Sequence, residues 1–354
     1  MSETLQDCQR RNGAVWAEDK SSILSFDNDE FALKAIQDGV ALCDRTHWGR
    51  LQFTEQDRLA FLHNQTTNVF KTLKPGEGCE SVFVTSTART IDLVNAYVTD
   101  DSVLLLVSPT RREQLMSWCD RYIFFGDKVK IEDITAQTIT FSLLGPESSL
   151  VLQKMGISAL PESTHHHITT QIKGHTVRVA SGSGLTTPGY TLFADAEWGA
   201  ELWQALTEQG SCPCGDTVWE QLRVIEGRPK PDAELTEDFN PLEAGLWQTI
   251  SFDKGCYIGQ ETIARLNTYQ GVKQRLWGIQ LSEPVSANTP ITVGDKKVGV
   301  LTSLVETSDG PLGLGYVKTK AGDAGANVSV GSGTGTLLEV PFLTYPQPTP
   351  NSTP

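Results

Sequence analysis

The spacing of apolar positions changes several times along the chain, and each change marks a predicted element. Between residues 29 and 37 apolar side chains recur at helical spacing, which predicts a helix closed by Gly39. Short apolar or alternating runs predict strands at 51–53, 81–85, 91–98, 103–107, 138–144, 176–180 and 189–193. Amphipathic stretches predict further helices at about 55–64, 109–124, 146–155, 197–209 and 215–226. Hairpins and helices in this order favour an α+β fold over strictly alternating βαβ units.

After Arg275 the pattern changes to short β segments separated by turns, which predicts a small all-β domain. These segments are 276–281, 291–293, 297–305, 312–318 and 336–343. We therefore expect a first α+β domain at 25–135, a second at 136–245, a connecting segment at 246–274, a C-terminal β-barrel domain at 275–345 and a disordered tail at 346–354.

Composition narrows the possible partners. The 354 residues carry a formal net charge of −14, which repels nucleic acid and anionic membranes unless basic residues cluster. The one local cluster in the sequence is Arg265, Lys273 and Arg275. No apolar run reaches the roughly 20 residues that span a bilayer. Residues 1–16 have neither signal-peptide nor transit-peptide character, so we expect a cytoplasmic protein, or one of an organelle matrix or stroma if a transit peptide was removed.

Cysteine and histidine patterns do not predict a metal site. The seven cysteines are odd in number and scattered, which argues against a disulfide framework and for a reducing compartment. Cys212 and Cys214 form one close pair, but a structural zinc site needs a second pair. His165, His166 and His167 cannot all face one ion, and their flanks are typical of an exposed linker.

The richest chemistry lies in residues 254–261, Lys-Gly-Cys-Tyr-Ile-Gly-Gln-Glu. A lysine beside Cys256 favours a thiolate, and the glycines permit close approach of a ligand or partner. The alternative is a tight turn with a half-buried, inert thiol. Asp92 is a single carboxylate within an apolar strand, so it lies either in water at the strand end or at a site.

Residues 253–261, together with Ala264 and Arg265, resemble the signature of the YgfZ-type folate-binding proteins, a branch of the glycine-cleavage T-protein (GcvT) superfamily that supports iron–sulfur cluster biogenesis. Further stretches are similar to the T-protein family: 39–44, 49–51, 61–68, 73–76, 222–229 and 240–246. The resemblance covers about residues 30–320. It implies three domains in a cloverleaf around a central, folate-sized opening, with the first two domains forming the folate site.

The resemblance also implies a cofactor and a set of site residues. Tetrahydrofolate or a derivative would be the cofactor, lined by Trp48, Asp92, Arg223 and Glu243. Trp48 would stack on a ring, or else belong to the core; Arg223 would pair with a carboxylate, or else lie on a helix surface. Cys256 and Asp92 are the expected reactive groups, within a motif formed by Lys254, Gly255, Cys256, Tyr257, Gly259, Gln260, Glu261 and Arg265.

Two departures from the T-protein pattern separate the candidate functions. The T-protein enzyme has a pair of aspartates where this chain has residues 88–92, which contain one carboxylate. The enzyme's acidic segment that contacts the pterin corresponds to residues 186–191, which contain no acidic residue. We therefore expect a tetrahydrofolate-binding accessory protein of iron–sulfur cluster assembly or repair, with iron–sulfur assembly proteins or client enzymes (including tRNA-modifying ones) as partners. Direct nucleic-acid or membrane binding is not expected. The alternative is a folate-dependent aminomethyltransferase, or a folate fold whose site has become an interaction surface.

Overall fold

The computed structural model describes residues 4–345, which fold as two compact units made of separate stretches of chain. Unit 1 comprises residues up to 62, 70–80 and 94–222, and unit 2 comprises 63–69, 81–93 and the chain from 223 onward. Two short segments of the N-terminal half thus belong to unit 2, which chain order alone did not indicate. The predicted tail at 346–354 lies outside the described residues.

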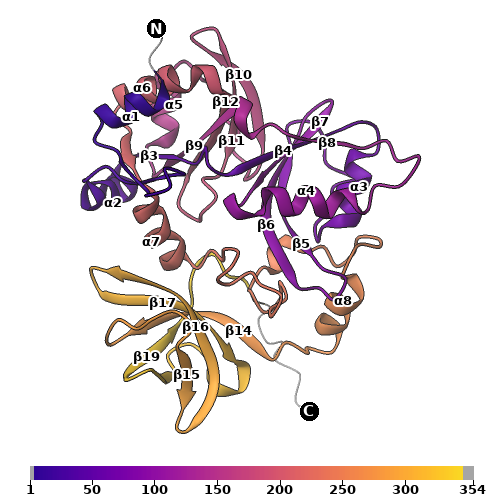
Figure 1. The fold of residues 1–354 in the computed structure, drawn as a ribbon, viewed down its shortest axis with the longest axis vertical. Helices are drawn as coiled ribbons and strands as arrows, with labels where there is room; N and C mark the ends of the chain where they lie inside the picture. Colours follow the sequence, from indigo (N-terminus) through magenta and orange to yellow (C-terminus); the bar gives the residue numbers. More distant parts are fainter. Residues whose placement is uncertain (1–3, 346–354) are drawn as a thin grey trace. The chain divides into compact units, whose positions relative to one another are not determined.

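The α-helices are short, and within residues 4–345 all of them lie between residues 5 and 268 (Figure 1). The α-helices are α1 (Leu5–Arg11), α2 (Asp29–Asp38), α3 (Arg58–Gln65), α4 (Arg112–Asp120), α5 (Ser148–Lys154), α6 (Gly199–Glu208), α7 (Asp216–Glu226) and α8 (Gln260–Thr268). Single 3₁₀ turns are η1 (Pro109–Arg111), η2 (Thr135–Gln137), η3 (Ala196–Trp198), η4 (Trp247–Thr249) and η5 (Thr319–Ala321).

Unit 1 is built around a six-stranded sheet of order β10-β11-β12-β9-β3-β13. Its strands are β3 (Ala41–Asp44), β9 (Thr138–Leu144), β10 (His167–Ile172), β11 (His175–Ser181), β12 (Gly189–Asp195) and β13 (Cys212–Cys214). Neighbouring strands are antiparallel except β13 and β3, which are parallel. A small hairpin of β1 (Val15–Trp16) and β2 (Ile23–Ser25) accompanies this sheet.

Alternation along the strands gives this sheet two apolar faces, because successive side chains point to opposite sides. Phe141 and Leu143 of β9 pack in one core with Trp203 of α6, and residues of α1 and α5 join them. Leu144 and Cys43 face the other core, which α2 and α7 cover. The sheet is therefore covered on both sides. This explains why β9 is buried along nearly its whole length even though Thr140 and Ser142 alternate with its apolar residues.

A second sheet has the order β5-β6-β7-β4-β8. Its strands are β4 (Gly49–Thr54), β5 (Gly78–Val84), β6 (Thr90–Val98), β7 (Ser102–Val107) and β8 (Lys130–Asp133). The division between the units falls within β5 and β6, so the hairpin loop between them, with its flanking strand ends at 81–93, belongs to unit 2.

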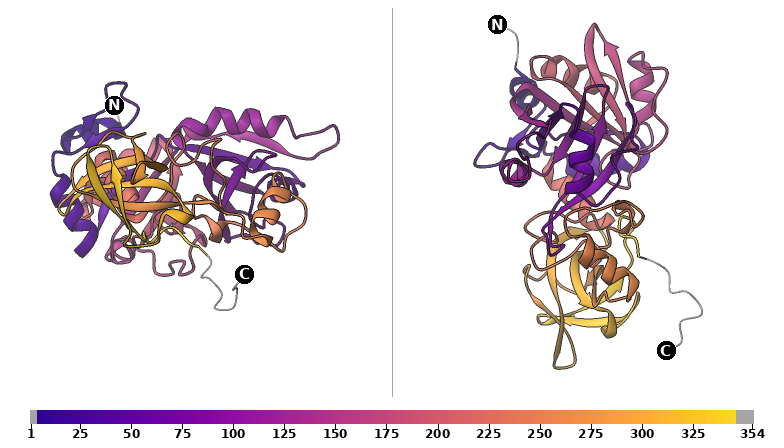
Figure 2. Two further views of the ribbon diagram at one scale, coloured as in Figure 1. Left: turned by 90° about the horizontal axis from the view of Figure 1, so that it is seen from below. Right: turned by 90° about the vertical axis from the view of Figure 1, so that its right-hand side faces the viewer.

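The C-terminal half of unit 2 is a closed six-stranded barrel, β14-β17-β16-β15-β18-β19, drawn in orange to yellow in Figure 1 and in both views of Figure 2. Its strands are β14 (Gln274–Leu281), β15 (Pro290–Val293), β16 (Lys296–Thr307), β17 (Gly310–Lys318), β18 (Asn327–Val330) and β19 (Gly333–Leu338). Ile279, Leu301 and Val330 belong to its interior. Closure removes open sheet edges, which fits a small all-β domain.

The α+β class and the C-terminal barrel predicted from sequence are both confirmed. Nine of the described α-helices and strands were not predicted: α1, α8, β1, β2, β3, β8, β10, β13 and β18. The assignment of the histidine run to an exposed linker is wrong for His167, which begins β10 and is buried, with Nε2 2.9 Å from the carbonyl oxygen of Val98. Burial and the neighbouring Arg178 lower the pKa of His167 to about 4, so this imidazole is a neutral structural group at physiological pH.

Candidate functional site

The motif segment lies along the short strap of residues 63–69, both within unit 2. The amide of Ser251 donates to the carbonyl of Thr67 (3.0 Å), and the amide of Ile258 donates to that of Asn64 (3.0 Å). The hydroxyl of Thr67 returns a hydrogen bond to the carbonyl of Thr249 (2.8 Å). These bonds hold both ends of the segment on one support.

Lys254 fixes the middle of the segment. Its side chain is buried, with 7% of the residue exposed. Its ammonium donates to the carbonyls of His63 (2.5 Å), Thr66 (2.7 Å) and Asn68 (2.5 Å), one for each N–H, and lies 4.5 Å from the ring centre of Tyr257. These carbonyls lie at and just beyond the C-terminal end of α3, where carbonyl groups lack helical partners. The lysine that was expected to act on the thiol thus places its charge on the strap.

Tyr257 anchors the next position. Its ring is buried against Ile250 and Ile263, in a cluster that also contains Ala88 and Leu242. Burial raises the pKa of Tyr257 to about 12, so the phenol stays protonated at physiological pH.

Gly255 and Gly259 have different roles. Gly259 has φ +80°, and a Cβ there would lie 2.8 Å from the carbonyl oxygen of Thr85 and 3.0 Å from a methyl group of Val84. A Cβ on Gly255 would meet nothing within 4 Å. Position 259 therefore requires glycine, because its backbone packs closely against residues 84 and 85. Position 255 has open space around its backbone and could accept a side chain.

We expect Gly259→Ala to destabilise the protein by about 2–3 kcal/mol, because it combines left-handed strain with a backbone clash. Gly255→Ala should change stability by less than about 0.5 kcal/mol and serves as the matched control. Chemical denaturation monitored by tryptophan fluorescence measures both. Equal effects of the two substitutions would contradict this assignment.

Cys256 is the one exposed cysteine of the seven, all of which lie in the described part of the chain. Burial raises the pKa of Cys119 to about 12 and that of Cys212 to about 11. A hydrogen bond to Cys214, together with burial, raises the pKa of Cys43. Cys256 is therefore the cysteine whose sulfur solvent and partners can reach.

With limiting iodoacetamide, we expect Cys256 to be alkylated at least about tenfold faster than any other cysteine, because thiol reactivity needs access and ionisation. Peptide mapping after a short pulse measures this. Labelling of Cys43 or Cys119 at the same rate would contradict a special role for Cys256.

The remaining motif residues form the start and outer face of α8. Gly259 is the N-cap, Gln260 is the first helical residue and Glu261 lies in the first turn, where a negative charge favours the helix dipole. Arg265 lies in the last turn and is exposed. The structure thus divides the motif into buried anchors (Lys254, Tyr257 and Gly259) and an accessible surface (Cys256, Glu261 and Arg265).

The residues expected to bind folate fall in both units. Asp92, Arg223 and Glu243 belong to unit 2, and their neighbours Leu93, Val224 and Ala244 pack in one apolar cluster. The structure therefore brings these three segments together. Trp48 belongs to unit 1.

Asp92 is fully buried within β6, which excludes the water-exposed strand end considered from sequence. Glu243 is also buried; its carboxylate accepts from the amide of Asn240 (3.1 Å). Burial raises the pKa of Glu243, and hydrogen bonds from Asn240 and Gln274 oppose that shift. Two carboxyl groups are thus kept out of bulk water, in an environment that favours the protonated form of Glu243.

Arg223 is buried, which excludes the helix-surface alternative. Its guanidinium lies 3.2 Å from the carboxylate of the fully buried Glu234 and donates to the hydroxyl of Ser303 (2.7 Å). Ser303 and Thr302 each donate to the other carboxylate oxygen of Glu234 at 2.6 Å. Arg223 thus has a protein carboxylate as partner. Sequence reasoning missed Glu234 because it lies in a turn-rich stretch.

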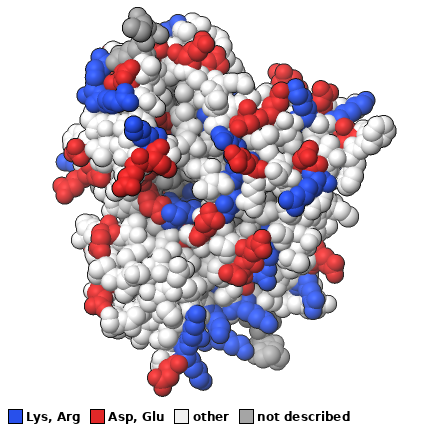
Figure 3. Space-filling model, viewed as in Figure 1, with Lys and Arg blue, Asp and Glu red and all other residues white. Residues whose placement is uncertain are grey.

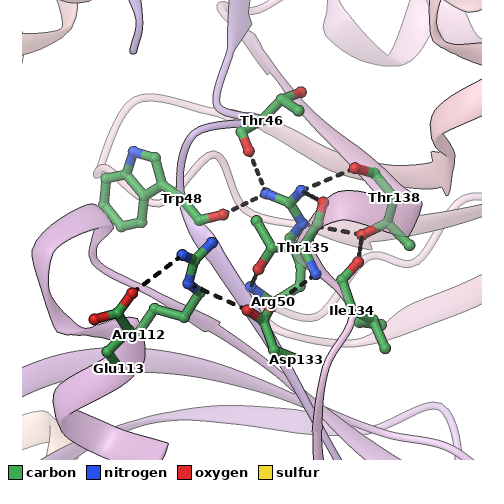
Figure 4. A network of polar contacts seen from close by, with 9 residues as sticks. All are labelled: Thr46, Trp48, Arg50, Arg112, Glu113, Asp133, Ile134, Thr135 and Thr138. Atoms are coloured by element: carbon green, nitrogen blue, oxygen red, sulfur yellow. Dashed lines mark hydrogen bonds and ion pairs between the residues drawn. The ribbon is translucent and has the colours of Figure 1, made fainter. Parts of the chain in front are cut away.

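In unit 1, Trp48 is packed as a core residue. The guanidinium of Arg45 lies 3.7 Å from its ring centre and 4.2 Å from that of Trp219, between the two indoles. Figure 4 shows how the adjacent backbone is held: buried Arg50 donates to the carbonyls of Trp48, Thr46 (2.6 Å), Thr135 (2.5 Å) and Thr138 (2.8 Å). Burial lowers the pKa of Arg50 to about 10, which still leaves it charged. Sequence patterns had assigned Arg50 no role.

Residues 4–345 contain no group of three or more His, Cys, Asp or Glu side chains placed to hold a metal ion. Cys212 and Cys214 lie instead in β13, paired with β3. No helix among these residues has the length and apolar character needed to cross a bilayer.

Comparison with known proteins adds three findings. The family model described as "GCVT N-terminal domain" matches residues 18–254. The chain is 45% identical to "Putative transferase At1g60990, chloroplastic" of Arabidopsis thaliana, over 92% of this chain and 76% of that protein. It is 26% identical to an aminomethyltransferase of Thermosynechococcus vestitus, over 84% and 82% of the two chains.

Among solved structures, the glycine cleavage system aminomethyltransferase T from Bartonella henselae is similar in fold. The TM-score is 0.85 at 17% identity, covering 96% of this chain and 97% of that one. At this identity the similarity shows the fold alone, an α/β T-protein fold with the closed C-terminal barrel.

Proposed function

Because the chain belongs to the family of the GCVT N-terminal domain, we propose that it is a tetrahydrofolate-binding accessory protein of iron–sulfur cluster assembly or repair, of the YgfZ type. Cys256 is its functional thiol. The observation that carries this proposal is the contrast between one exposed cysteine and the buried anchors on either side of it.

The buried residues on either side of Cys256 support a role in which its thiol is exposed to a partner and not packed in the core. Lys254 and Tyr257 bury their side chains on both sides of Cys256, and Gly255 leaves open space beside it. A rigid support places an exposed group reproducibly, which a partner or cluster ligand requires. A merely structural turn would have no need for an exposed sulfur between two buried anchors.

Folate binding is proposed from family membership and from the two buried carboxyl groups in unit 2. Asp92 and Glu243 are the proposed contacts for polar groups of the pterin, which they can hydrogen-bond in a place shielded from water. Arg223 acts through Glu234 to position this region. Since no acidic residue occupies 186–191, we expect weaker folate binding than in an aminomethyltransferase.

The proposed partners are iron–sulfur assembly proteins or client enzymes, including iron–sulfur tRNA-modifying enzymes. Arg265 and Lys273, both exposed, extend the surface next to Cys256 along the chain and would attract an acidic partner. The chloroplastic location in the Arabidopsis relative's name supports a stromal place of action.

A second candidate function is folate-dependent aminomethyl transfer. It is favoured by the buried Asp92, a carboxyl group within β6 that lies away from bulk water and could serve as a positioned acid or base. Against it stands the single carboxylate in residues 88–92.

We expect a strain lacking this protein to lose activity of several iron–sulfur enzymes, and we expect the wild type, but not Cys256→Ala, to restore it. Asp253→Asn, an exposed change on the same segment, is the matched control and should restore activity. Equal melting temperatures for the two variants would show that the difference is chemical. Full rescue by Cys256→Ala would remove the thiol from the function.

The two candidate functions are separated by turnover with tetrahydrofolate and the aminomethylated carrier protein. We expect no production of 5,10-methylene-tetrahydrofolate above background, together with saturable tetrahydrofolate binding that Asp92→Asn weakens. Robust turnover abolished by Asp92→Asn would establish the aminomethyltransferase instead.

A further inference from the structure

The C-terminal barrel is electrically polarised. All six lysines and arginines between residues 273 and 345 fall at the start of β14, the start of β16 or the end of β17: Lys273, Arg275, Lys296, Lys297, Lys318 and Lys320. Strand pairing places these points together, because β17 is antiparallel to both β14 and β16. Gln274 pairs with Lys318, and the amide of Thr319 donates to the carbonyl of Lys273 (3.0 Å). We call these six residues the basic barrel end.

The opposite end of the barrel carries no lysine or arginine. It holds three acidic residues: Glu283, Glu306 and Asp309. Three acidic residues, Asp295, Asp323 and Glu339, accompany the six cations at the basic barrel end. The barrel residues carry as many acidic as basic side chains. The positive charge at one end therefore comes from where these side chains lie along the strands and not from an excess of basic residues.

The cations of the basic barrel end are free to meet a ligand. Its five lysines are exposed, and none of them forms an ion pair with a carboxylate within residues 4–345. Figure 3 shows Lys and Arg side chains gathered at the lower edge of the surface drawn there. On a chain of net charge −14, such a concentration of positive charge selects anions.

A large cavity opens at the same end. It has a volume of about 1160 Å³, and its walls include two indoles and a phenol, from Trp247, Trp277 and Tyr345, beside Arg275 and the aliphatic side chains of Leu338 and Val340. The guanidinium of Arg275 lies 4.8 Å from the ring centre of Tyr345. Tyr269, at the end of α8 beside the wall residue Gln270, adds an aromatic ring that is 78% exposed.

Two residues of the cavity wall carry N–H groups without an acceptor among residues 4–345. These groups are the indole N–H of Trp277, a residue that is 6% exposed, and Nε of Arg275. Buried donors without acceptors are uncommon in folded proteins.

From this combination we propose that the basic barrel end and its cavity bind a phosphorylated nucleoside, either free or within a single-stranded nucleic acid. Phosphate groups pair with lysine and arginine, and bases stack on aromatic rings. An acidic peptide would use the cations but has no ring system for the indoles. This site includes neither Cys256 nor the proposed folate contacts. It shares Lys273 with the surface proposed for an acidic partner, so the variants that test it are placed at Lys318 and Lys320 instead.

Intrinsic tryptophan fluorescence is the appropriate readout, because two indoles line the cavity. The full chain is titrated with ATP, with a dodecamer of oligouridylate, with inorganic tripolyphosphate and with polyglutamate. We expect saturable quenching by ATP, by the oligonucleotide or by both, weakening as salt is raised. The stronger of these two ligands tells whether the natural one is free or polymeric.

Variants locate the site. Lys318→Glu/Lys320→Glu should weaken binding at least about tenfold, and Trp247→Phe should reduce the quenching, whereas Cys256→Ala should change neither. Lys34→Glu/Lys71→Glu, two exposed lysines of unit 1, provides the same charge change as a control and should leave binding unchanged. The proposal is overturned if neither nucleotide ligand binds at millimolar concentration. It is equally overturned if tripolyphosphate or polyglutamate binds as tightly, or if the control pair weakens binding as much.

Discussion

Arg223→Ala will lower the free energy of unfolding by about 3–5 kcal/mol, because it leaves the carboxylate of Glu234 buried without its guanidinium. Arg223 is 2% exposed and Glu234 is fully buried, so water cannot replace the lost partner. Urea denaturation followed by tryptophan fluorescence and circular dichroism measures the change.

Two controls sharpen this result. Arg265→Ala removes an exposed arginine of the same unit and should change stability by less than about 0.5 kcal/mol. Arg223→Met/Glu234→Leu removes both charges, so it should be clearly more stable than Arg223→Ala. A loss below about 1 kcal/mol for Arg223→Ala would mean that the pair contributes little, as exposed pairs do.

The second large effect is expected at Lys254. Lys254→Met keeps most of the side-chain volume but removes the ammonium from the carbonyls of His63, Thr66 and Asn68. Leaving buried acceptors without donors costs about 1–3 kcal/mol each, so we expect a loss of about 3 kcal/mol after partial rearrangement. Denaturation curves give this value.

The functional consequence distinguishes two roles for this lysine. If Lys254 positions the segment, Lys254→Met should impair rescue of iron–sulfur enzyme activity and raise backbone amide exchange across residues 63–69 as well as 251–259. Lys34→Met, an exposed lysine of unit 1 to which no function is assigned, is the control and should alter neither. If Lys254→Met leaves backbone amide exchange across residues 63–69 unchanged but slows the alkylation of Cys256, then Lys254 activates the thiol and does not position the segment.

Local patterns were sufficient for most of the secondary structure. The strand at 138–144 and the helix from residue 29 have the predicted bounds to within a residue, because each has a strong period and clear ends. The helix α8 was missed since its apolar side is short, with Ile263 buried and Leu266 half-buried. The strand β10 was missed because a run of polar residues hid its alternation.

For the candidate site, too, some residues could be predicted from the sequence and others could not. Sequence order was enough to single out Cys256 and its flanking motif, since these residues are adjacent in the chain. It could not show that Lys254 would reach the strap, because the partner carbonyls lie 186 to 191 residues away in sequence. Backbone carbonyls carry no side-chain identity, so no residue pattern announces them.

The amino-acid sequence by itself determined the α+β class, the barrel and the motif with its cysteine, because periodicity and adjacency are local properties that a single chain displays. Tertiary structure alone decided which buried charges are paired, as for Arg223 with Glu234, and where dispersed charges gather, as at the basic barrel end. Both depend on which strands and loops become neighbours. That is settled by the packing of the whole chain, where distant segments meet to bury apolar surface and to satisfy buried polar groups.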